Sequence, residues 1–198
     1  VHGGRFHPTG HLLLRQYGAA AGLKGDFTIM DQEDAEGLMQ LARQALGYGK
    51  KEKRFPKKET LHYVYSRHVN TGRSIEHVLE TELPQFVDFT QEIIRIFIEY
   101  TERKSVRNLV DYDDLLLTWL LMLEQSPALA EKIAGLYQHV LVDEYQDTNL
   151  LQAQILLGMC RTHKNITVVG DDAQSIYSFR GAHFRNILVF PQQFPGAR

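Results

Sequence analysis

The stretch Val140-Leu141-Val142-Asp143-Glu144-Tyr145-Gln146-Asp147-Thr148-Asn149 does most to decide the expected fold. In it, a short apolar run ends abruptly in two adjacent carboxylates. A buried parallel strand delivers side chains in this way to the carboxyl edge of its sheet, where open α/β folds bind ligands. We therefore predict a strand over residues 139–142, with Asp143 and Glu144 at an edge where a ligand binds.

A second strand is predicted at residues 166–169, after a helical pattern over residues 149–163. The order strand, crossover helix, strand makes a βαβ unit, which requires a parallel sheet. The second strand leads into Gly170-Asp171-Asp172-Ala173-Gln174-Ser175-Ile176-Tyr177-Ser178-Phe179-Arg180-Gly181-Ala182. The C-terminal part of the chain is therefore predicted to be α/β.

Helical periodicity covers most of the remaining sequence. A short strand is predicted at residues 27–30, and helices at 11–21, 31–46, 57–69, 74–82, 84–104, 112–124, 127–138 and 183–193. The pattern between residues 31 and 110 is helical throughout. We therefore predict an all-helical insertion at residues 31–110, within a parallel-sheet α/β domain formed by residues 1–30 and 111–198.

The composition is that of a globular chain with a substantial core, at 198 residues and 43% hydrophobic. No apolar run reaches the roughly 18 residues that a membrane span needs, and no signal-peptide pattern opens the sequence. The single cysteine, Cys160, lies in an apolar helical pattern and is expected to serve packing. These features predict a protein of the cytoplasm or nucleoid that makes no contact with a membrane.

Charge is unevenly distributed. Residues 43–73 contain nine Lys or Arg residues against Glu52 and Glu59, a balance of +7 that leaves −9 for the rest of the chain. A basic segment beside aromatic side chains is suited to a nucleic-acid backbone, because bound cations release counterions from the phosphates. A charge run can also be no more than a solvated loop and helix face.

The Asp143-Glu144 pair has the residue types that phosphoanhydride hydrolysis needs. That reaction requires a divalent cation to neutralise developing charge and a group that deprotonates or orients the attacking water. Asp143 would hold Mg²⁺, directly or through water, and Glu144 would accept the proton. An isolated Asp-Glu pair more often marks only the place where a strand meets solvent, but the ten-residue string favours the hydrolytic interpretation.

The segment after the second strand adds a sensor and a stacking pattern. Gln174 is an uncharged donor and acceptor that can register the presence of a phosphate oxygen. Tyr177 and Phe179 are alternate aromatics beside Arg180, a combination suited to stacking on unpaired bases, worth about 1–3 kcal/mol per base. Alternate aromatics taken alone are more often part of a core.

Together the two segments resemble the UvrD/Rep/PcrA family of superfamily 1 DNA helicases. Residues 143–149 are similar to the family's motif II and residues 170–182 to its motif III. Arg5-Phe6-His7-Pro8 resembles motif Ib, with Arg5 where Thr is usual, and residues 110–116 resemble the segment that leads into motif II. The resemblance runs from about residue 5 to the end of the chain.

This resemblance implies an ATP-dependent DNA helicase that moves 3′ to 5′ on single strands in DNA repair, replication or recombination. Its cofactors would be ATP and Mg²⁺, and its partners single-stranded DNA and junctions between single and double strands. By similarity, Asp143 binds Mg²⁺, Glu144 is the catalytic base and Gln174 contacts the γ-phosphate. The residues expected to contact DNA are Phe6, His7, Tyr177, Phe179 and Arg180.

The resemblance also implies a fold. Residues 1–30 and 111–198 would be part of a RecA-like P-loop NTPase sheet, subdomain 1A, and residues 31–110 would form the helical subdomain 1B. A P-loop is not found in the sequence: Gly49-Lys50 is followed by Lys51 where Ser or Thr is required. We therefore expect a fragment of the N-terminal motor region, inactive on ATP without the remainder of its polypeptide.

Two other interpretations stay open at this point. The chain could be a nucleic-acid-binding module without catalysis, which would fit the missing P-loop. It could also belong to the helicase subunit of a helicase–nuclease, which shares these motifs.

Overall fold

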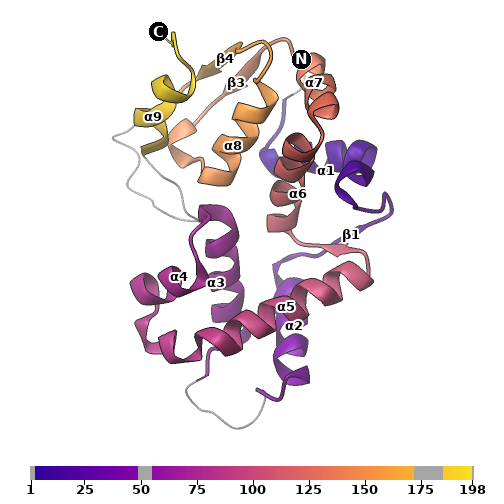
Figure 1. Cartoon of the computed structure of the whole chain (residues 1–198), viewed down its shortest axis with the longest axis vertical. Coiled ribbons are helices and arrows are strands. Elements are labelled where there is room, and N and C mark those ends of the chain that lie inside the picture. Colours follow the sequence, from indigo (N-terminus) through magenta and orange to yellow (C-terminus); the bar gives the residue numbers. More distant parts are fainter. Residues whose placement is uncertain (1–2, 49–54, 172–184, 198) are drawn as a thin grey trace. The chain divides into compact units, whose positions relative to one another are not determined.

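A computed structural model describes residues 3–48, 55–171 and 185–197. The chain divides into two compact units (Figure 1). The first unit consists of Val1–Gly22 together with Leu116–Arg198, and the second of Leu23–Leu115. The described structure is mostly helical, with two small parallel sheets, one in each unit.

The sheet of the first unit is the predicted βαβ arrangement. Strand β3 (Val140–Val142) pairs in parallel with β4 (Ile166–Val168), and Val142 lies opposite Val168. Helix α8 (Leu150–Met159) connects the two strands. The helix ends before the predicted limit of residue 163, because the chain then turns through Lys164, whose φ of 54° is left-handed, into β4.

The other helices of the first unit agree with the sequence pattern in type and differ in bounds. They are α1 (Phe6–Tyr17), the 3₁₀ helix η1 (Gly18–Ala21), α6 (Tyr112–Gln125), of which the part from Leu116 onward belongs to this unit, α7 (Pro127–Leu136) and α9 (Arg185–Gln193). Helix α1 begins well before the predicted start at residue 11. Pro8 is compatible with this start, since proline is tolerated in the first helical turn.

A hydrophobic cluster covers one face of the β3–β4 pair. Val142, Tyr145 and Leu156 are buried in it, and the partly buried side chains packed against them are Phe6, Val140, Ile166, Val168 and Phe190. The Tyr145 and Phe190 rings meet edge to face, with centroids 5.5 Å apart. By contrast, Leu141 is 76% exposed to solvent. The period of two along β3 thus directs Val140 and Val142 into the core and Leu141 away from it.

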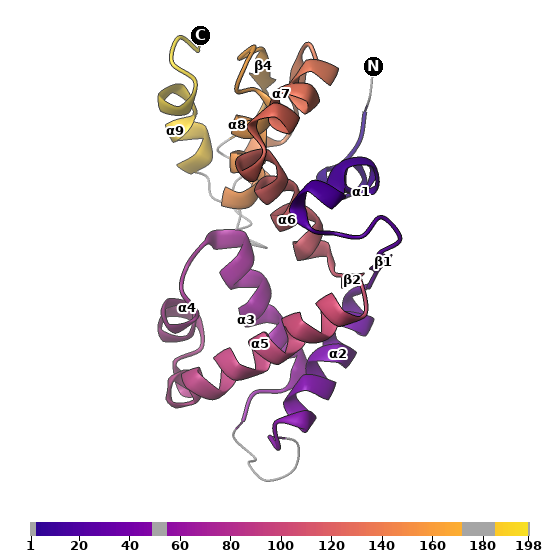
Figure 2. The ribbon, with the colours of Figure 1, turned by 45° about the vertical axis from the view of Figure 1, so that its right-hand side comes forward.

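The second unit is helical apart from one short strand pair (Figure 2). Its elements are β1 (Thr28–Ile29), α2 (Gln32–Ala45), α3 (Lys58–Thr71), α4 (Ile75–Glu82), the 3₁₀ helix η2 (Pro84–Phe89), α5 (Thr90–Val106) and β2 (Leu109–Val110). The strand at β1 is confirmed. Strand β2, which pairs with it in parallel, was not predicted, and the helix predicted over 84–104 is two elements.

Side-chain caps and a common core hold this helical unit together. Asp31 Oδ1 accepts the Asp34 N–H at 2.9 Å to cap α2, and Ser74 Oγ accepts the His77 N–H to cap α4. Helices α2, α3, α4 and α5 contribute fully buried side chains to a single core, among them Met39, Leu61, Leu79, Ile93 and Tyr100. Burial of these side chains in one shared core is what holds the four helices together.

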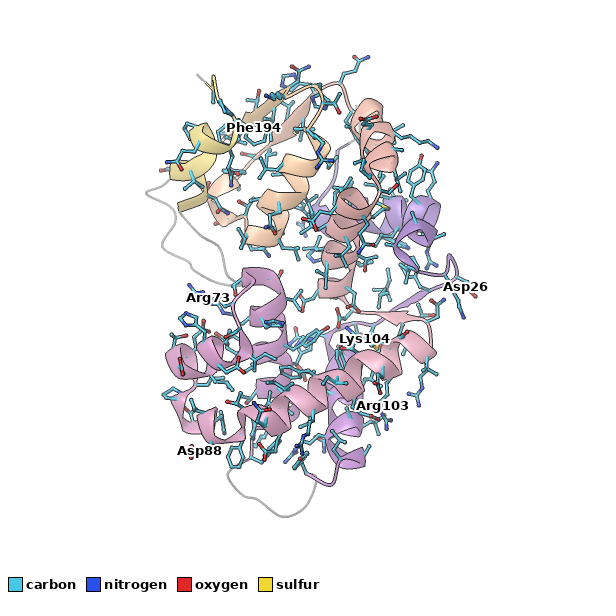
Figure 3. All side chains as sticks on the ribbon, viewed as in Figure 1. Asp26, Arg73, Asp88, Arg103, Lys104 and Phe194 are labelled. Atoms are coloured by element: carbon cyan, nitrogen blue, oxygen red, sulfur yellow. The ribbon has the colours of Figure 1, made fainter. Side chains whose placement is uncertain are left out.

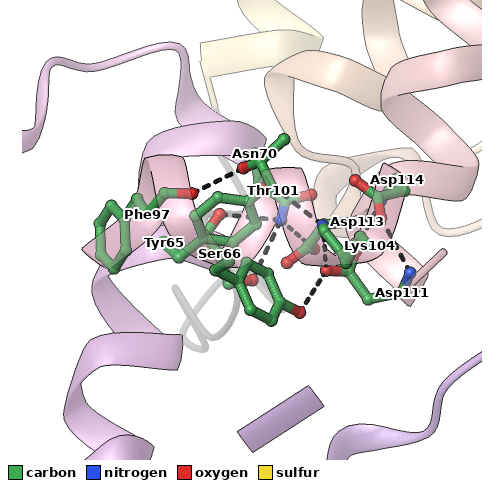
Figure 4. Close-up of polar contacts among 10 residues, drawn as sticks. Tyr65, Ser66, Asn70, Phe97, Thr101, Lys104, Asp111, Asp113 and Asp114 are labelled. Atoms are coloured by element: carbon green, nitrogen blue, oxygen red, sulfur yellow. Dashed lines mark hydrogen bonds and ion pairs between the residues drawn. The ribbon is translucent and has the colours of Figure 1, made fainter. Parts of the chain in front are cut away.

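A buried ion network lies at the end of this unit (Figures 3 and 4). Lys104 on α5 is 2% exposed, and its Nζ is 2.7 Å from both Asp111 Oδ2 and Asp114 Oδ2. The Tyr100 hydroxyl also donates to Asp111 Oδ2, at 2.7 Å. Asp111 and Asp114 each accept the other's backbone N–H, which satisfies two donors at the start of α6.

Within the described ranges, no helix combines the length and the apolar character that crossing a membrane requires.

Candidate functional site

Asp143 and Glu144 follow β3 directly and are both exposed. The backbone joins this loop to the residues that follow β4. The Val169 N–H donates to the Val142 carbonyl at 2.8 Å, and the Tyr145 N–H donates to the Val169 carbonyl at 2.9 Å. The carboxyl ends of both strands therefore meet at one edge, with the two carboxylates beside the start of residues 170–182.

Glu144 has a left-handed backbone, with φ 51° and ψ 44°. Asp143 Oδ1 accepts the Glu144 N–H at 3.0 Å, and the chain then enters the 3₁₀ turn η3 (Tyr145–Asp147). A residue other than glycine is uncommon in this conformation, which costs on the order of 1 kcal/mol and is concentrated at functional sites. The tight turn keeps Asp143 and Glu144 at the sheet edge while the next two side chains enter the core.

Gln146 is one of those buried side chains, at 2% exposure. Its Nε2 donates to Glu144 Oε2 at 2.5 Å, and its Oε1 accepts the Asp171 N–H at 3.1 Å. One amide therefore binds the carboxylate after β3 and the backbone after β4. The sequence interpretation quoted Gln146 within motif II but gave it no role. Its role depends on a hydrogen bond to Asp171, 25 residues later in the chain, so the local sequence carries no signal for it.

The far end of the loop is anchored by hydrogen bonds to buried polar side chains. Thr148 Oγ1 donates to the Tyr145 carbonyl at 2.6 Å, and Asn186 Nδ2 on α9 donates to the Thr148 carbonyl at 2.8 Å. Asn149 then caps α8. Asn186 is another residue that the sequence interpretation missed, because a single asparagine in a helical pattern carries no distinguishing signal.

The residues present fit a magnesium ion. Mg²⁺ keeps several waters and is usually held by one or two protein carboxylates rather than by a full protein cage. The exposed Asp143 carboxylate at the sheet edge meets that requirement. In the part of the chain that the structure describes, no three His, Cys, Asp or Glu side chains gather into a cluster, as a zinc site would need.

The structure places some of the other predicted site residues and not the rest. Phe6 and His7 form the first turn of α1 and are partly buried. The Phe6 ring packs in the same cluster as Val142 and Tyr145 and lies 6.4 Å from the Trp119 ring. Phe6 is thus brought to the base of the Asp143 loop. The remaining predicted residues lie outside the described ranges: Gln174, Tyr177, Phe179 and Arg180.

Part of the basic segment at residues 43–73 is neutralised within the second unit. Glu82 pairs with Arg67 at 2.5 Å and with Arg73 at 3.9 Å, and Lys58 lies 3.7 Å from Glu36. Both acids are outside the segment itself. The segment's net charge therefore overstates the positive surface that it offers to an anionic partner.

The sequence is similar to those of known proteins over nearly its whole length. The family described as the UvrD/REP helicase N-terminal domain matches residues 2–195. DNA helicase II of Haemophilus influenzae is 33% identical over 192 residues, which cover 96% of this chain and 25% of that protein. DNA helicase II of Escherichia coli is 32% identical, over 98% of this chain and 26% of the relative. ATP-dependent DNA helicase Rep of Escherichia coli is 29% identical, over 98% of this chain and 28% of that protein.

The chain thus spans about a quarter of the length of these curated relatives. The family match extends over nearly all of its residues, including the Asp143 loop and α1. The chain therefore belongs to the UvrD/REP helicase N-terminal domain family.

Proposed function

We propose that this chain is part of an ATP-dependent DNA helicase and supplies the acidic loop for ATP hydrolysis. The observation that supports this most is the position of Asp143 and Glu144. Both carboxylates are exposed at the carboxyl edge of a parallel strand pair, on a tight turn fixed to the neighbouring strand. The family match and the names of the relatives support the same function.

In the proposed reaction, Asp143 would hold Mg²⁺, directly or through water. The ion's chemistry is to neutralise the negative charge that develops on the phosphate oxygens. Glu144 takes the proton from the water whose oxygen attacks the γ-phosphorus, while the bond from that phosphorus to the ADP oxygen breaks. The products are ADP and inorganic phosphate. Gln174 would contact the γ-phosphate, as the sequence resemblance implies.

The DNA path is proposed from the same resemblance. Phe6 and His7 would lie near the DNA backbone, and the bases would stack near Tyr177, Phe179 and Arg180. Movement would be 3′ to 5′ on single strands, toward a junction with double-stranded DNA. We further propose that the first unit is part of a RecA-like domain, that the second corresponds to its helical insertion, and that the protein works in the cytoplasm on the nucleoid.

The test is steady-state ATP hydrolysis with single-stranded DNA, measured on the longer polypeptide proposed to contain this chain. Glu144→Gln should lower kcat by about 10²-fold or more, because the proton acceptor is lost, while ATP binding is kept. The matched control is Glu131→Gln, which changes an exposed glutamate on α7 and should leave kcat unchanged. Near-normal hydrolysis in Glu144→Gln would remove Glu144 from this role.

The 198-residue chain by itself provides a second arm of the same test. Its sequence has no P-loop, and the backbone amides of that loop cradle the phosphates. We expect no DNA-stimulated ATP turnover from the chain alone, and stimulated turnover would contradict the proposed division of the site.

A further inference from the structure

We infer that Gln146 is a positioning residue that fixes the Glu144 carboxylate and ties it to the backbone after β4. This inference rests on the proposed function, because it assigns a support to the proposed catalytic base. It goes further in naming a direct physical link between that base and the backbone of Asp171, through a single side chain.

The link is made by the two ends of one amide. Nε2 of Gln146 donates to Glu144 Oε2 at 2.5 Å, and Oε1 accepts the Asp171 N–H at 3.1 Å. The side chain is 2% exposed, so water does not readily replace either partner. A buried amide that loses a partner incurs the desolvation cost of the unmatched group, which keeps both bonds in place.

The surrounding backbone makes the link stiff. The turn η3 begins directly after the left-handed Glu144, and the Asp147 N–H donates to the Glu144 carbonyl at 2.9 Å. The Tyr145 side chain next to Gln146 is locked in the hydrophobic cluster under the sheet edge. A displacement of the Asp171 backbone therefore reaches Glu144 through a side chain that has little freedom to absorb it.

This arrangement has a consequence for the reaction. Gln146 engages Oε2 of Glu144, so Oε1 is the oxygen that we assign to the attacking water. Gln174, the proposed γ-phosphate contact, is three residues beyond Asp171 in the same segment. The position of the Asp171 backbone would then set the orientation of the base, and a misplacement of about 1 Å can cost on the order of 10²-fold in rate.

Glutamine is the residue type that this role needs, since it alone among similar shapes offers both a donor and an acceptor. Gln146→Met keeps the length and removes both bonds. Gln146→Glu keeps an acceptor for the Asp171 N–H but replaces the donor toward Glu144 with a second carboxylate. The two variants therefore separate the two bonds.

The first measurement is amide hydrogen exchange of the chain, which needs no nucleotide. Exchange at Asp171 should be faster in Gln146→Met than in the unchanged chain, and Gln146→Glu should retain the protection. Equal protection of the Asp171 amide in Gln146→Met and the unchanged chain would overturn the inference, because the hydrogen bond from Asp171 to Gln146 would then not hold that backbone in place.

The second measurement is DNA-stimulated ATP hydrolysis by the longer polypeptide. Both Gln146 variants should lose about 10- to 100-fold in kcat while the Kd for ATP changes little, because the base is misoriented and the nucleotide contacts remain. The control Gln152→Met removes a capping-box bond at the start of α8, which costs stability without touching Glu144 or Asp171. It should keep kcat.

The outcomes distinguish this inference from the function on which it rests. If Glu144→Gln itself hydrolyses ATP normally, the proposed function fails and the inference with it. If Glu144→Gln is inactive but Gln146→Met keeps its kcat, the inference alone is overturned. An equal loss in Gln152→Met would also overturn it, because the effect would then be general destabilisation of the loop.

Discussion

At the scale of single residues, Lys104 is a buried charge at the centre of the ion network in the second unit. Two carboxylates and the hydroxyl of Tyr65 surround its ammonium group, and the Tyr100 ring centroid is 4.4 Å away. Burial alone would lower the pKa of Lys104, but the charges of Asp111 and Asp114 outweigh it and raise that pKa above its usual value. The lysine is therefore charged and fully compensated in the folded chain.

Lys104→Met should destabilise the chain by about 3–5 kcal/mol, because it leaves two buried carboxylates without their cation. The control is Arg103→Met, one residue earlier on α5 (Figure 3). Arg103 forms an i,i+4 pair with Glu99 in which both side chains are 27% exposed, a pair worth about 0.5 kcal/mol. Urea unfolding measures the free energy of unfolding of both variants. An equal decrease in the two would contradict the stabilising role assigned to the buried ion network.

The same network predicts a pH dependence. Burial and the negative charge of Asp111 raise the pKa of Asp114 to about 6, despite the nearby Lys104. The folded state then binds this proton more tightly than the unfolded state does, so the stability that it contributes is present below about pH 4 and is lost as the pH rises through about 6. The loss is on the order of 2–3 kcal/mol.

Asp111 acts in the opposite direction. Burial favours its neutral form, but the charge and hydrogen bond of Lys104 outweigh burial and hold the pKa of Asp111 below its usual value. Its contribution to stability is therefore lost as the pH falls below about 4.

The variant Asp114→Asn tests the raised pKa of Asp114. Between about pH 4 and pH 7, its free energy of unfolding, measured with urea, should decline less than that of the unchanged chain. Identical slopes would show that Asp114 does not titrate in this range.

The residue types at the candidate site were predictable, whereas their supports were not. Asp143 and Glu144 were identified because an apolar run stops at them. Gln146 and Asn186 act through bonds to Asp171 and Thr148, which are remote in sequence. Contacts of that kind depend on how β4 and α9 pack, and no local periodicity encodes them.

At the scale of elements, the start of α8 shows how local chemistry fixes a boundary next to the site. Asn149 accepts the Gln152 N–H at 2.8 Å, and the Gln152 side chain accepts the Asn149 N–H at 3.0 Å. This reciprocal pair ends the loop that carries Asp143 and begins the crossover helix.

Asn149→Ala should destabilise the chain by about 1 kcal/mol, because the Gln152 N–H at the start of α8 loses its side-chain acceptor. The comparison variant is Ser126→Ala at the start of α7, where the side chain makes no capping bond. That change should leave the midpoint of thermal unfolding nearly unmoved. A similar shift in both variants would contradict the assignment of stability to the capping box.

Element types were predicted more reliably than element limits. The stretch 84–104 has continuous helical periodicity, yet residues 84–89 form the 3₁₀ helix η2 before α5 begins at Thr90. Phe86, Val87 and Phe89 are partly buried against the core of the second unit, and this packing decides the geometry over local propensity. Strand β2 is only two residues long and depends on pairing with β1, so its own sequence gave no signal.

At the scale of the whole molecule, the sequence predicted a helical insertion at residues 31–110, and the described structure forms a compact unit over Leu23–Leu115. The limits differ because the first pair follows from helical periodicity in the sequence and the second from contacts between residues in the structure. Long-range contacts such as the pairing of Thr28 with Leu109 bring the two ends of this unit together. Their partners are far apart in sequence, so no window of residues could have revealed them.

The family match turns the acidic loop from a pattern into a proposed catalytic element. The relatives are DNA helicases about four times as long as this chain. We therefore propose that the reaction needs further parts of a longer polypeptide. We propose that this chain contributes to that reaction the sheet edge that presents Asp143 and Glu144, together with the buried Gln146 amide.

The most direct test is a crystal structure of the longer polypeptide with Mg²⁺ and a non-hydrolysable ATP analogue. The account predicts the metal about 2 Å from an Asp143 carboxylate oxygen, or one water molecule away from it, with Glu144 facing the γ-phosphate. Nucleotide and metal bound at another edge of the molecule, with no contact to Asp143 or Glu144, would contradict it.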